Sequence, residues 1–208
     1  MSRTRLIRLA ACLAIATGSA HASTELIVNG SFEAEVLPNN DAVFLPNLTG
    51  WTGGPDAIEL RNNLVGTAYD GHNFVELDTY TNSSMSQTVN TQAGLKYTLS
   101  FAYSPRQNMY LGSNGIDVFW NGEQVGSYSA KGGPDGNVWS IEVLELYGQA
   151  GTSTLTFAAA GVSDGQGGSL DAVSLTSPVP EPESYAMLLL GMGMLGAIAR
   201  RKAANSKA

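Results

Sequence analysis

The segment Tyr97-Thr98-Leu99-Ser100-Phe101-Ala102-Tyr103 decides the fold class, because large apolar side chains alternate along it with small or polar ones. This period of two places successive side chains on opposite faces of a β-strand. Residues 116–120 repeat the pattern and are followed by Asn121-Gly122, a strong signal for a two-residue hairpin turn. The returning strand is expected at 125–128. These segments together predict an antiparallel β-structure.

Further short strands are expected on both sides of this region, near residues 26–28, 57–60, 73–77, 84–90, 139–143, 153–159 and 170–176. Gly, Asn, Ser and Pro clusters separate them, as turns require. No stretch between residues 25 and 176 shows an apolar period of 3.6. Many strands without crossover helices predict an all-β fold, an antiparallel β-sandwich of jelly-roll type. Residues 105–115 and 130–136 are expected to form its longer loops.

The charges of the chain are unevenly distributed. All eighteen carboxylates lie within residues 25–183, and this segment carries a net charge of −14 because it holds only four cationic residues, Arg61, Lys96, Arg106 and Lys131. A body this acidic repels phosphate backbones, which excludes nucleic acid as a partner. Cys12 is the only cysteine, and His72 is the only histidine beyond residue 21.

The N-terminus has the composition of a secretory signal peptide. Three arginines at positions 3, 5 and 8 precede an apolar run over residues 9–17. Small residues then lead to Ala20-His21-Ala22, an A-x-A cleavage site. We therefore expect a signal peptide over residues 1–22, cleavage after Ala22, and export through the Sec machinery. The mature chain then contains no cysteine.

The C-terminus combines prolines, an apolar run and a basic cluster. Pro178, Pro180 and Pro182 interrupt regular structure, so that residues 177–184 are expected to be a linker. Residues 185–199 carry no charge and precede the basic cluster, which consists of Arg200, Arg201 and Lys202. The pattern predicts one short transmembrane helix within 185–208, with its basic end in the cytoplasm. The alternative is a buried core helix, because apolar runs this short are often buried in soluble proteins.

Val179-Pro180-Glu181-Pro182, the Gly-rich apolar run and Arg200-Arg201-Lys202 together resemble the PEP-CTERM sorting signal. The resemblance implies recognition of Pro180, Glu181 and Pro182 by an exosortase-type processing enzyme. It also implies transient anchoring in the inner membrane, removal of the tail, and a final location at the cell surface or outside the cell, in organisms that often make exopolysaccharide.

The body, residues 23–176, also resembles a known family. It opens with Asn29-Gly30-Ser31-Phe32-Glu33 and closes with Ser169-Leu170-Asp171-Ala172-Val173. These motifs are similar to those of the galactose-binding-like jelly roll shared by many carbohydrate-binding modules. In such modules a structural calcium ion often joins the first and last strands, and the matching positions here are Glu33 and Asp171. The alternative is that Glu33 only caps a turn and Asp171 only starts a strand.

A sugar-binding face is a second expectation. The candidate stacking side chains are Trp51, Tyr69, Tyr80, Tyr110, Trp120 and Trp139. Trp120 and Trp139 lie in alternating strands, which favours a place in the core. Trp51 and Tyr110 lie in loop-like surroundings, and both a core role and a binding role stay open for them. Arg106 and Asn108, in the long loop, are candidates for hydrogen bonds to the ligand.

Three functions fit these features. The favoured one is a non-catalytic surface or matrix protein, and the second is a module that binds extracellular polysaccharide. The third is a glycosidase that uses two carboxylates. It is the least favoured, because no spacing singles out two of the eighteen acids and a single histidine leaves few catalytic schemes.

Overall fold

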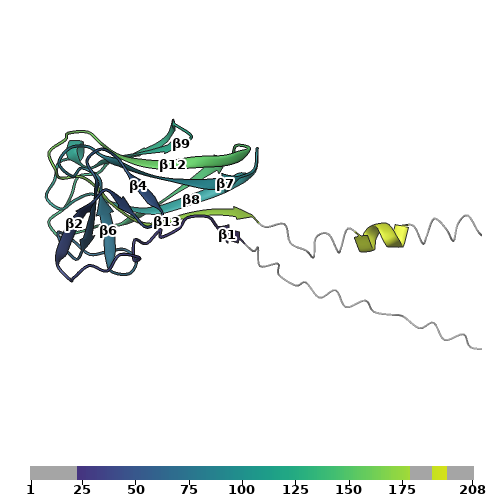
Figure 1. The fold of residues 1–208 in the computed structure, drawn as a ribbon, viewed down its shortest axis with the longest axis horizontal. Helices are drawn as coiled ribbons and strands as arrows, with labels where there is room; N and C mark the ends of the chain where they lie inside the picture. The colour runs from purple at the N-terminus through teal and green to yellow at the C-terminus, as the bar shows by residue number, and fades with distance from the viewer. Residues whose placement is uncertain (1–22, 179–188, 196–208) are drawn as a thin grey trace, which may run out of the picture. The chain divides into compact units, whose positions relative to one another are not determined.

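Two antiparallel sheets packed face to face make up the folded body of this protein (Figure 1). The computed structural model describes residues 23–178 and 189–195. Ser23–Val179 form one compact unit, and thirteen strands lie within it. The prediction of an all-β antiparallel sandwich is confirmed.

The first sheet contains seven strands, and β13 (Ser169–Pro178) is central in it. In spatial order the path is β11 (Ser140–Tyr147), β8 (Lys96–Ser104), β13, β6 (Asn73–Glu76), β5 (Ile58–Asn62) and β2 (Asp41–Leu45). The short strand β1 (Ser23–Glu25) pairs with the far end of β13, where Ser23 lies opposite Pro178. The first and last strands of the body are therefore neighbours.

The second sheet contains six strands. Its order is β10 (Glu123–Tyr128), β9 (Gly115–Trp120), β12 (Gly151–Ala160), β7 (Ser84–Thr91), β4 (Trp51–Gly53) and β3 (Asn47–Leu48). Asn121 and Gly122 connect β9 to β10 with φ angles of 55° and 83°, as a two-residue hairpin turn requires. The predicted hairpin is therefore confirmed.

The core lies between the two sheets. The large side chains of the 97–103 segment all point inward and are buried, as the alternation predicts. Phe101 of the first sheet meets Phe157 of the second at a ring distance of 5.1 Å, in an edge-to-face arrangement. Aromatic contacts of this kind join the two layers and add to the apolar area that folding removes from water.

The prediction differs from the structure at the start of the body. Residues 26–28 are not a strand, and the first strand is β1, three residues earlier. Strands β2, β3 and β4 were not expected. β3 and β4 are two and three residues long, too short to show a period. The side chains of β2 do not alternate between buried and exposed, because it is the edge strand of its sheet.

Strand β13 changes partner along its length. Its first residues pair with β6, and its last residues pair with β1. Between these two segments of β13, its register with β8 shifts between Asp171 and Ser174. Ala172, within the shift, has a φ of 48°. Such a bulge re-aims the side chains beside it. Asp171 is the last residue in regular register before this bulge, opposite Ala102.

The signal peptide expected over residues 1–22 lies outside the described residues. Of the predicted 185–199 helix, only residues 189–195 are described, and these are helical. Among the described residues, no helix is both long and apolar enough to cross a bilayer.

Candidate functional site

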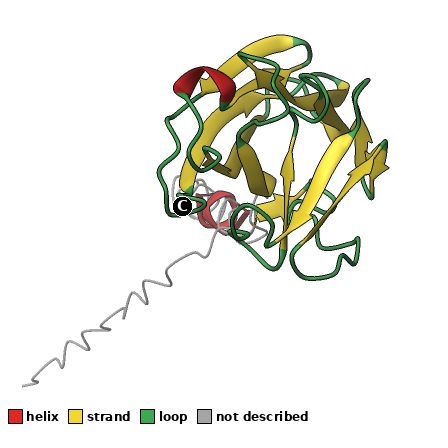
Figure 2. Cartoon of the chain, turned by 90° about the vertical axis from the view of Figure 1, so that its left-hand side faces the viewer, coloured by secondary structure: helices red, strands yellow, loops and turns green. Residues whose placement is uncertain are grey.

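Two long loops meet at one end of the sandwich, where β8 and β10 finish and β9 begins. Figure 2 faces this end, with the 3₁₀ helix η1 (Leu111–Ser113) at its rim. The backbone N–H of Asn108 donates to the carbonyl oxygen of Gly133 at 2.9 Å, and that of Gly132 donates to Met109 at 3.1 Å. A Cβ atom at Gly132 would lie only 1.8 Å from the carbonyl oxygen of Arg106, so this close approach requires glycine.

Asn114 is fully buried, and its side chain forms hydrogen bonds with both loops. Its amide nitrogen donates to the carbonyl oxygens of Tyr110 at 3.2 Å and Ala130 at 3.1 Å. Its amide oxygen accepts the N–H of Arg106 at 2.9 Å. One side chain thus fixes the backbone of both loops. The sequence gives no signal for this role, because its partners are up to sixteen residues away.

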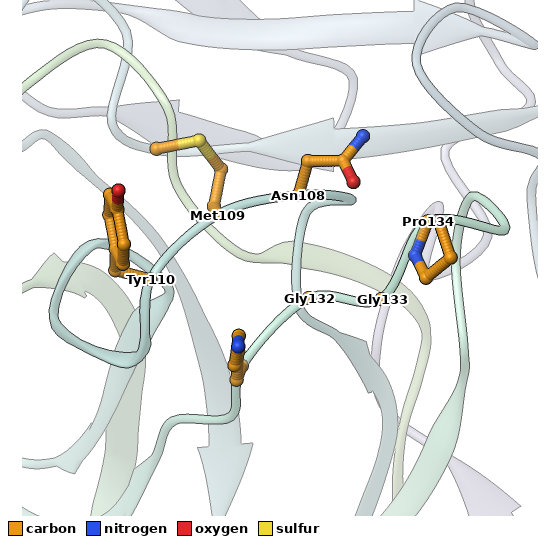
Figure 3. A pocket seen from close by; sticks show the side chains of 7 residues that line it. Asn108, Met109, Tyr110, Gly132, Gly133 and Pro134 are labelled. Carbon is orange, nitrogen blue, oxygen red and sulfur yellow. The ribbon is translucent and has the colours of Figure 1, made fainter.

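A shallow cavity of about 550 Å³ opens between the two loops, lined by residues 108–110 and 131–134. Figure 3 shows Tyr110 and Pro134 at opposite sides of it, with Asn108 and Met109 between them on one run of chain. Tyr110 is 76% exposed, so its ring is free to contact a ligand. The structure therefore brings two of the predicted ligand-binding residues, Asn108 and Tyr110, to one cavity.

The other two predicted ligand-binding residues lie elsewhere. The expectation that Trp51 offers a stacking surface is wrong, because Trp51 is only 2% exposed and packs in the core against Phe32 and Phe157. Its indole N–H donates to the carbonyl oxygen of Asn29 at 3.0 Å. Arg106 does not line the cavity, and its guanidinium group turns inward to the buried carboxylate of Glu76.

Glu76 is the centre of a buried charge cluster on the outer face of the first sheet. Arg61 lies 2.6 Å from it and Arg106 lies 3.2 Å from it, while Glu59 pairs with Arg61 at 2.8 Å. Burial raises the pKa of Glu76 to about 7, although both guanidinium groups oppose that shift. The backbone N–H of Gly167 also donates to Glu76. This cluster anchors the loop around residue 106 from beneath.

The remaining aromatic candidates divide between core and surface. Trp120 is buried, and its indole donates to the carbonyl oxygen of Tyr147, as its alternating strand predicted. Trp139 is half-buried against Phe74 and Tyr69. Tyr80 is 72% exposed and stacks on Phe44 with a ring distance of 5.0 Å. None of these side chains lines the cavity.

Glu33 and Asp171, the predicted calcium ligands, are brought to a single loop. Glu33 accepts the backbone N–H groups of His72 at 2.7 Å and Asn73 at 2.6 Å. Asp171 accepts those of Tyr69 at 2.8 Å and Asp70 at 2.9 Å. Burial raises the pKa of Asp171 to about 7, against the opposing effect of these amide donors. The two carboxylates therefore hold the 69–73 loop from both ends.

Two details of this region bear on a metal ion. Phe32 and Ala172, each next to one of the two acids, have φ angles of 60° and 48°, which strain a residue with a side chain. The amide oxygen of Asn73 is buried without a hydrogen-bond partner. Carboxylate and amide oxygens are donors that calcium takes. In the described residues, however, no three His, Cys, Asp or Glu side chains are grouped to hold a metal.

Three groups of predicted residues lie outside the described residues. They are the sorting residues Pro180, Glu181 and Pro182, the basic cluster at 200–202, and the cleavage residues Ala20 and Ala22. The evidence for a sorting motif in the tail comes from its sequence. Residues 178–202 match the family model of the PEP-CTERM protein-sorting motif. The resemblance of the tail is thereby confirmed.

Two curated relatives match a much longer stretch than the tail. A multifunctional-autoprocessing repeats-in-toxin of Vibrio cholerae serotype O1 is 36% identical over 157 residues, which cover 73% of this chain. The corresponding toxin of Vibrio vulnificus is 35% identical over 153 residues, or 71% of this chain. The chain spans only 3% of the length of either toxin. The likeness is therefore to a small part of each toxin.

Solved structures share the sandwich at low sequence identity. A Stig cyclase, FisC from Fischerella sp. TAU, superposes with a TM-score of 0.57 at 13% identity and covers 77% of this chain and 100% of its own. A family 35 carbohydrate-binding module from Clostridium thermocellum gives a TM-score of 0.45 at 17% identity, covering 67% and 99%. The cyclase likeness establishes a shared fold and nothing about shared chemistry.

Proposed function

We propose that this chain is an exported, non-catalytic protein of the cell surface or extracellular matrix, processed by an exosortase-type enzyme. The sorting motif at residues 178–202 carries the proposal. The compact folded unit supports it, because this unit lies between the predicted signal peptide and the tail that carries the sorting motif.

The composition of the body supports a role without catalysis. His72 is the only histidine left after the predicted cleavage, which leaves few schemes that use an imidazole as a general base. The acids Glu59 and Glu76 are buried and paired with Arg61. Association of the mature protein with exopolysaccharide or a biofilm is part of the same proposal.

The decisive experiment is mass spectrometry of the protein recovered from its own cells and medium. We expect an N-terminus at Ser23 and a C-terminus within residues 180–183. A variant with Pro180, Glu181 and Pro182 all replaced by alanine should keep the tail and stay in the membrane fraction. Wild-type protein that ends at Ala208 in the membrane fraction would show that the tail is a permanent anchor and would exclude the exosortase step.

Binding of extracellular polysaccharide is a second candidate function, favoured by the cavity at residues 108–110 and 131–134. It combines an exposed aromatic ring, Tyr110, with the amide of Asn108 on a backbone that Asn114 holds in place. Aromatic faces and fixed polar groups are the elements of small-ligand sites. A glycan array probed with residues 23–178 tests this function. Loss of a glycan signal in Tyr110→Ala would support it, and an array without any signal would exclude it.

We also propose a structural calcium ion between Glu33 and Asp171, with the amide oxygen of Asn73 as a further donor. The convergence of the two acids on the 69–73 loop supports this proposal. The ion would join the first and last segments of the body, and it would supply no chemistry.

A further inference from the structure

Lys131 distinguishes the cavity from the rest of this acidic body. Residues 23–178 contain four cationic side chains, and three of them are paired with carboxylates. Arg61 pairs with Glu59 and Glu76, Arg106 pairs with Glu76, and Lys96 pairs with Glu145. Lys131 forms no ion pair with any described residue. It is exposed at the cavity, where its charge is free to meet a ligand.

The lining of the cavity contains no carboxylate. Residues 23–178 hold sixteen carboxylates and four cationic side chains, and Lys131 is the one charged side chain among the residues that line the cavity. Asp135 follows the lining segment in sequence and is not part of the lining. At physiological salt the screening length is about 8 Å, so a ligand in the cavity experiences mainly the nearest charges. The charge carried by the lining itself is therefore positive, although the body as a whole is acidic.

The position of Lys131 relative to Tyr110 is fixed by the backbone. Two hydrogen bonds, from the N–H of Gly132 to the carbonyl oxygen of Met109 and from the N–H of Asn108 to that of Gly133, hold the two runs of chain side by side. Asn114 binds the carbonyl oxygens of Tyr110 and Ala130, the residue directly before Lys131. The aromatic ring and the ammonium group are thus carried on one preorganised frame, which lowers the entropic cost of binding.

An aromatic face, an amide and one free ammonium group match a sugar ring that bears a carboxylate. We infer that the cavity binds anionic polysaccharide, with a uronic acid residue stacked on Tyr110 and its carboxylate paired with Lys131. This inference rests on the proposed polysaccharide-binding function and specifies its ligand class. An exposed ion pair of this kind changes affinity by about two- to fivefold.

Calorimetry with matched ligands tests the inference. The probes are oligogalacturonate and oligomannuronate, each compared with the same oligosaccharide after reduction of its carboxyl groups to alcohols. The proteins are residues 23–178 in wild-type form and the variants Lys131→Gln, Lys131→Arg and Lys96→Gln. Lys96 is the matched control, because it is the other exposed lysine of the body and is already paired with Glu145 on strand β11.

We expect the wild type and Lys96→Gln to bind at least one acidic oligosaccharide about two- to fivefold more tightly than its reduced form, with the preference falling as salt is added. Lys131→Gln should lose the preference and keep binding to the reduced form, while Lys131→Arg should retain the preference.

Two results would overturn the inference, and they are distinguishable. A preference for the acidic forms that persists in Lys131→Gln, or tighter binding of the reduced forms by the wild type, would exclude the role of Lys131 and leave polysaccharide binding intact. Failure of all the oligosaccharides, together with an empty glycan array, would exclude the polysaccharide-binding function itself.

Discussion

Two buried carboxylates, Glu76 and Asp171, are the residues whose protonation is most strongly coupled to folding. Burial raises the pKa of both to about 7, from ordinary values of 4.5 and 3.8. A raised pKa in the folded state means that folding favours the protonated form. The stability that each acid contributes is therefore fully present below its unfolded-state pKa and is lost as the pH rises towards 7.

The first prediction follows from this sign. The unfolding free energy should fall by up to about 3 kcal/mol per acid between pH 4.5 and pH 7.5, because one unit of pKa shift corresponds to about 1.4 kcal/mol. Urea denaturation across this range measures the change. Glu76→Gln should roughly halve the slope, whereas Glu145→Gln, on exposed β11, should leave it unchanged. An equal slope in all three proteins would contradict the assignment to Glu76.

The calcium proposal gives the second prediction. A ligand that binds only the folded state raises the melting temperature by mass action. Calcium should therefore raise the melting temperature of residues 23–178, and a chelator should lower it. Glu33→Gln should remove this response. Glu35→Gln is a useful comparison, because Glu35 lies two residues away and holds the N–H of Thr49. A melting temperature that calcium and chelator leave unchanged in the wild type would end the proposal.

The candidate site shows which residues a sequence can reveal. Asn108 and Tyr110 were predicted because they lie in a long loop between clear strands. Trp51 looked similar, yet it packs against Phe157, more than one hundred residues away, and such a distant partner leaves no local pattern. Lys131 and Asn114 were missed for the same reason, since their importance depends on two loops that meet only in the folded protein.

At the scale of elements, alternation predicted the long strands well. β8 and β9 were located from their apolar period, because each buries one face against the opposite sheet, and strands were also expected near the observed positions of β7, β12 and β13. The short strands β2 to β4 lacked a signal, because their positions are set by pairing with β5 and β7 rather than by their own side chains. The sequence therefore located the long strands better than the short ones.

The hairpin between β9 and β10 gives the third prediction. Gly122 has a φ of 83°, and nothing lies within 4 Å of where a Cβ atom would be, so Gly122→Ala introduces backbone strain without a clash. We expect a loss of about 1–2 kcal/mol in the unfolding free energy, measured with urea. Gly112→Ala is the control, because its Cβ would make only an ordinary contact with Val162 at 3.9 Å and its φ is not in the left-handed region. Equal stability of the two variants would contradict the turn assignment.

At the scale of the whole molecule, the first sheet depends on its last strand. β13 lies between β8 and β6 and also receives β1, so that its removal separates the sheet into unconnected parts. The fourth prediction is that residues 23–178 unfold cooperatively on heating, whereas residues 23–168 show no cooperative transition. Calorimetry of the two fragments provides the comparison. A sharp transition in the shorter fragment would show that the second sheet is stable alone.

The central place of β13 also sets an order of events in time. A chain that leaves the cytoplasm from its N-terminus delivers residues 169–178 last of all the body, and until then β1, β6 and β8 have no partner along that side. In an exported chain the first sheet would therefore be completed only after its final strand has emerged. The sorting motif starts at residue 178, so this strand would emerge directly before the sorting signal. A processing enzyme in the membrane would therefore meet the sorting motif at the stage when the last strand of the first sheet becomes available for pairing.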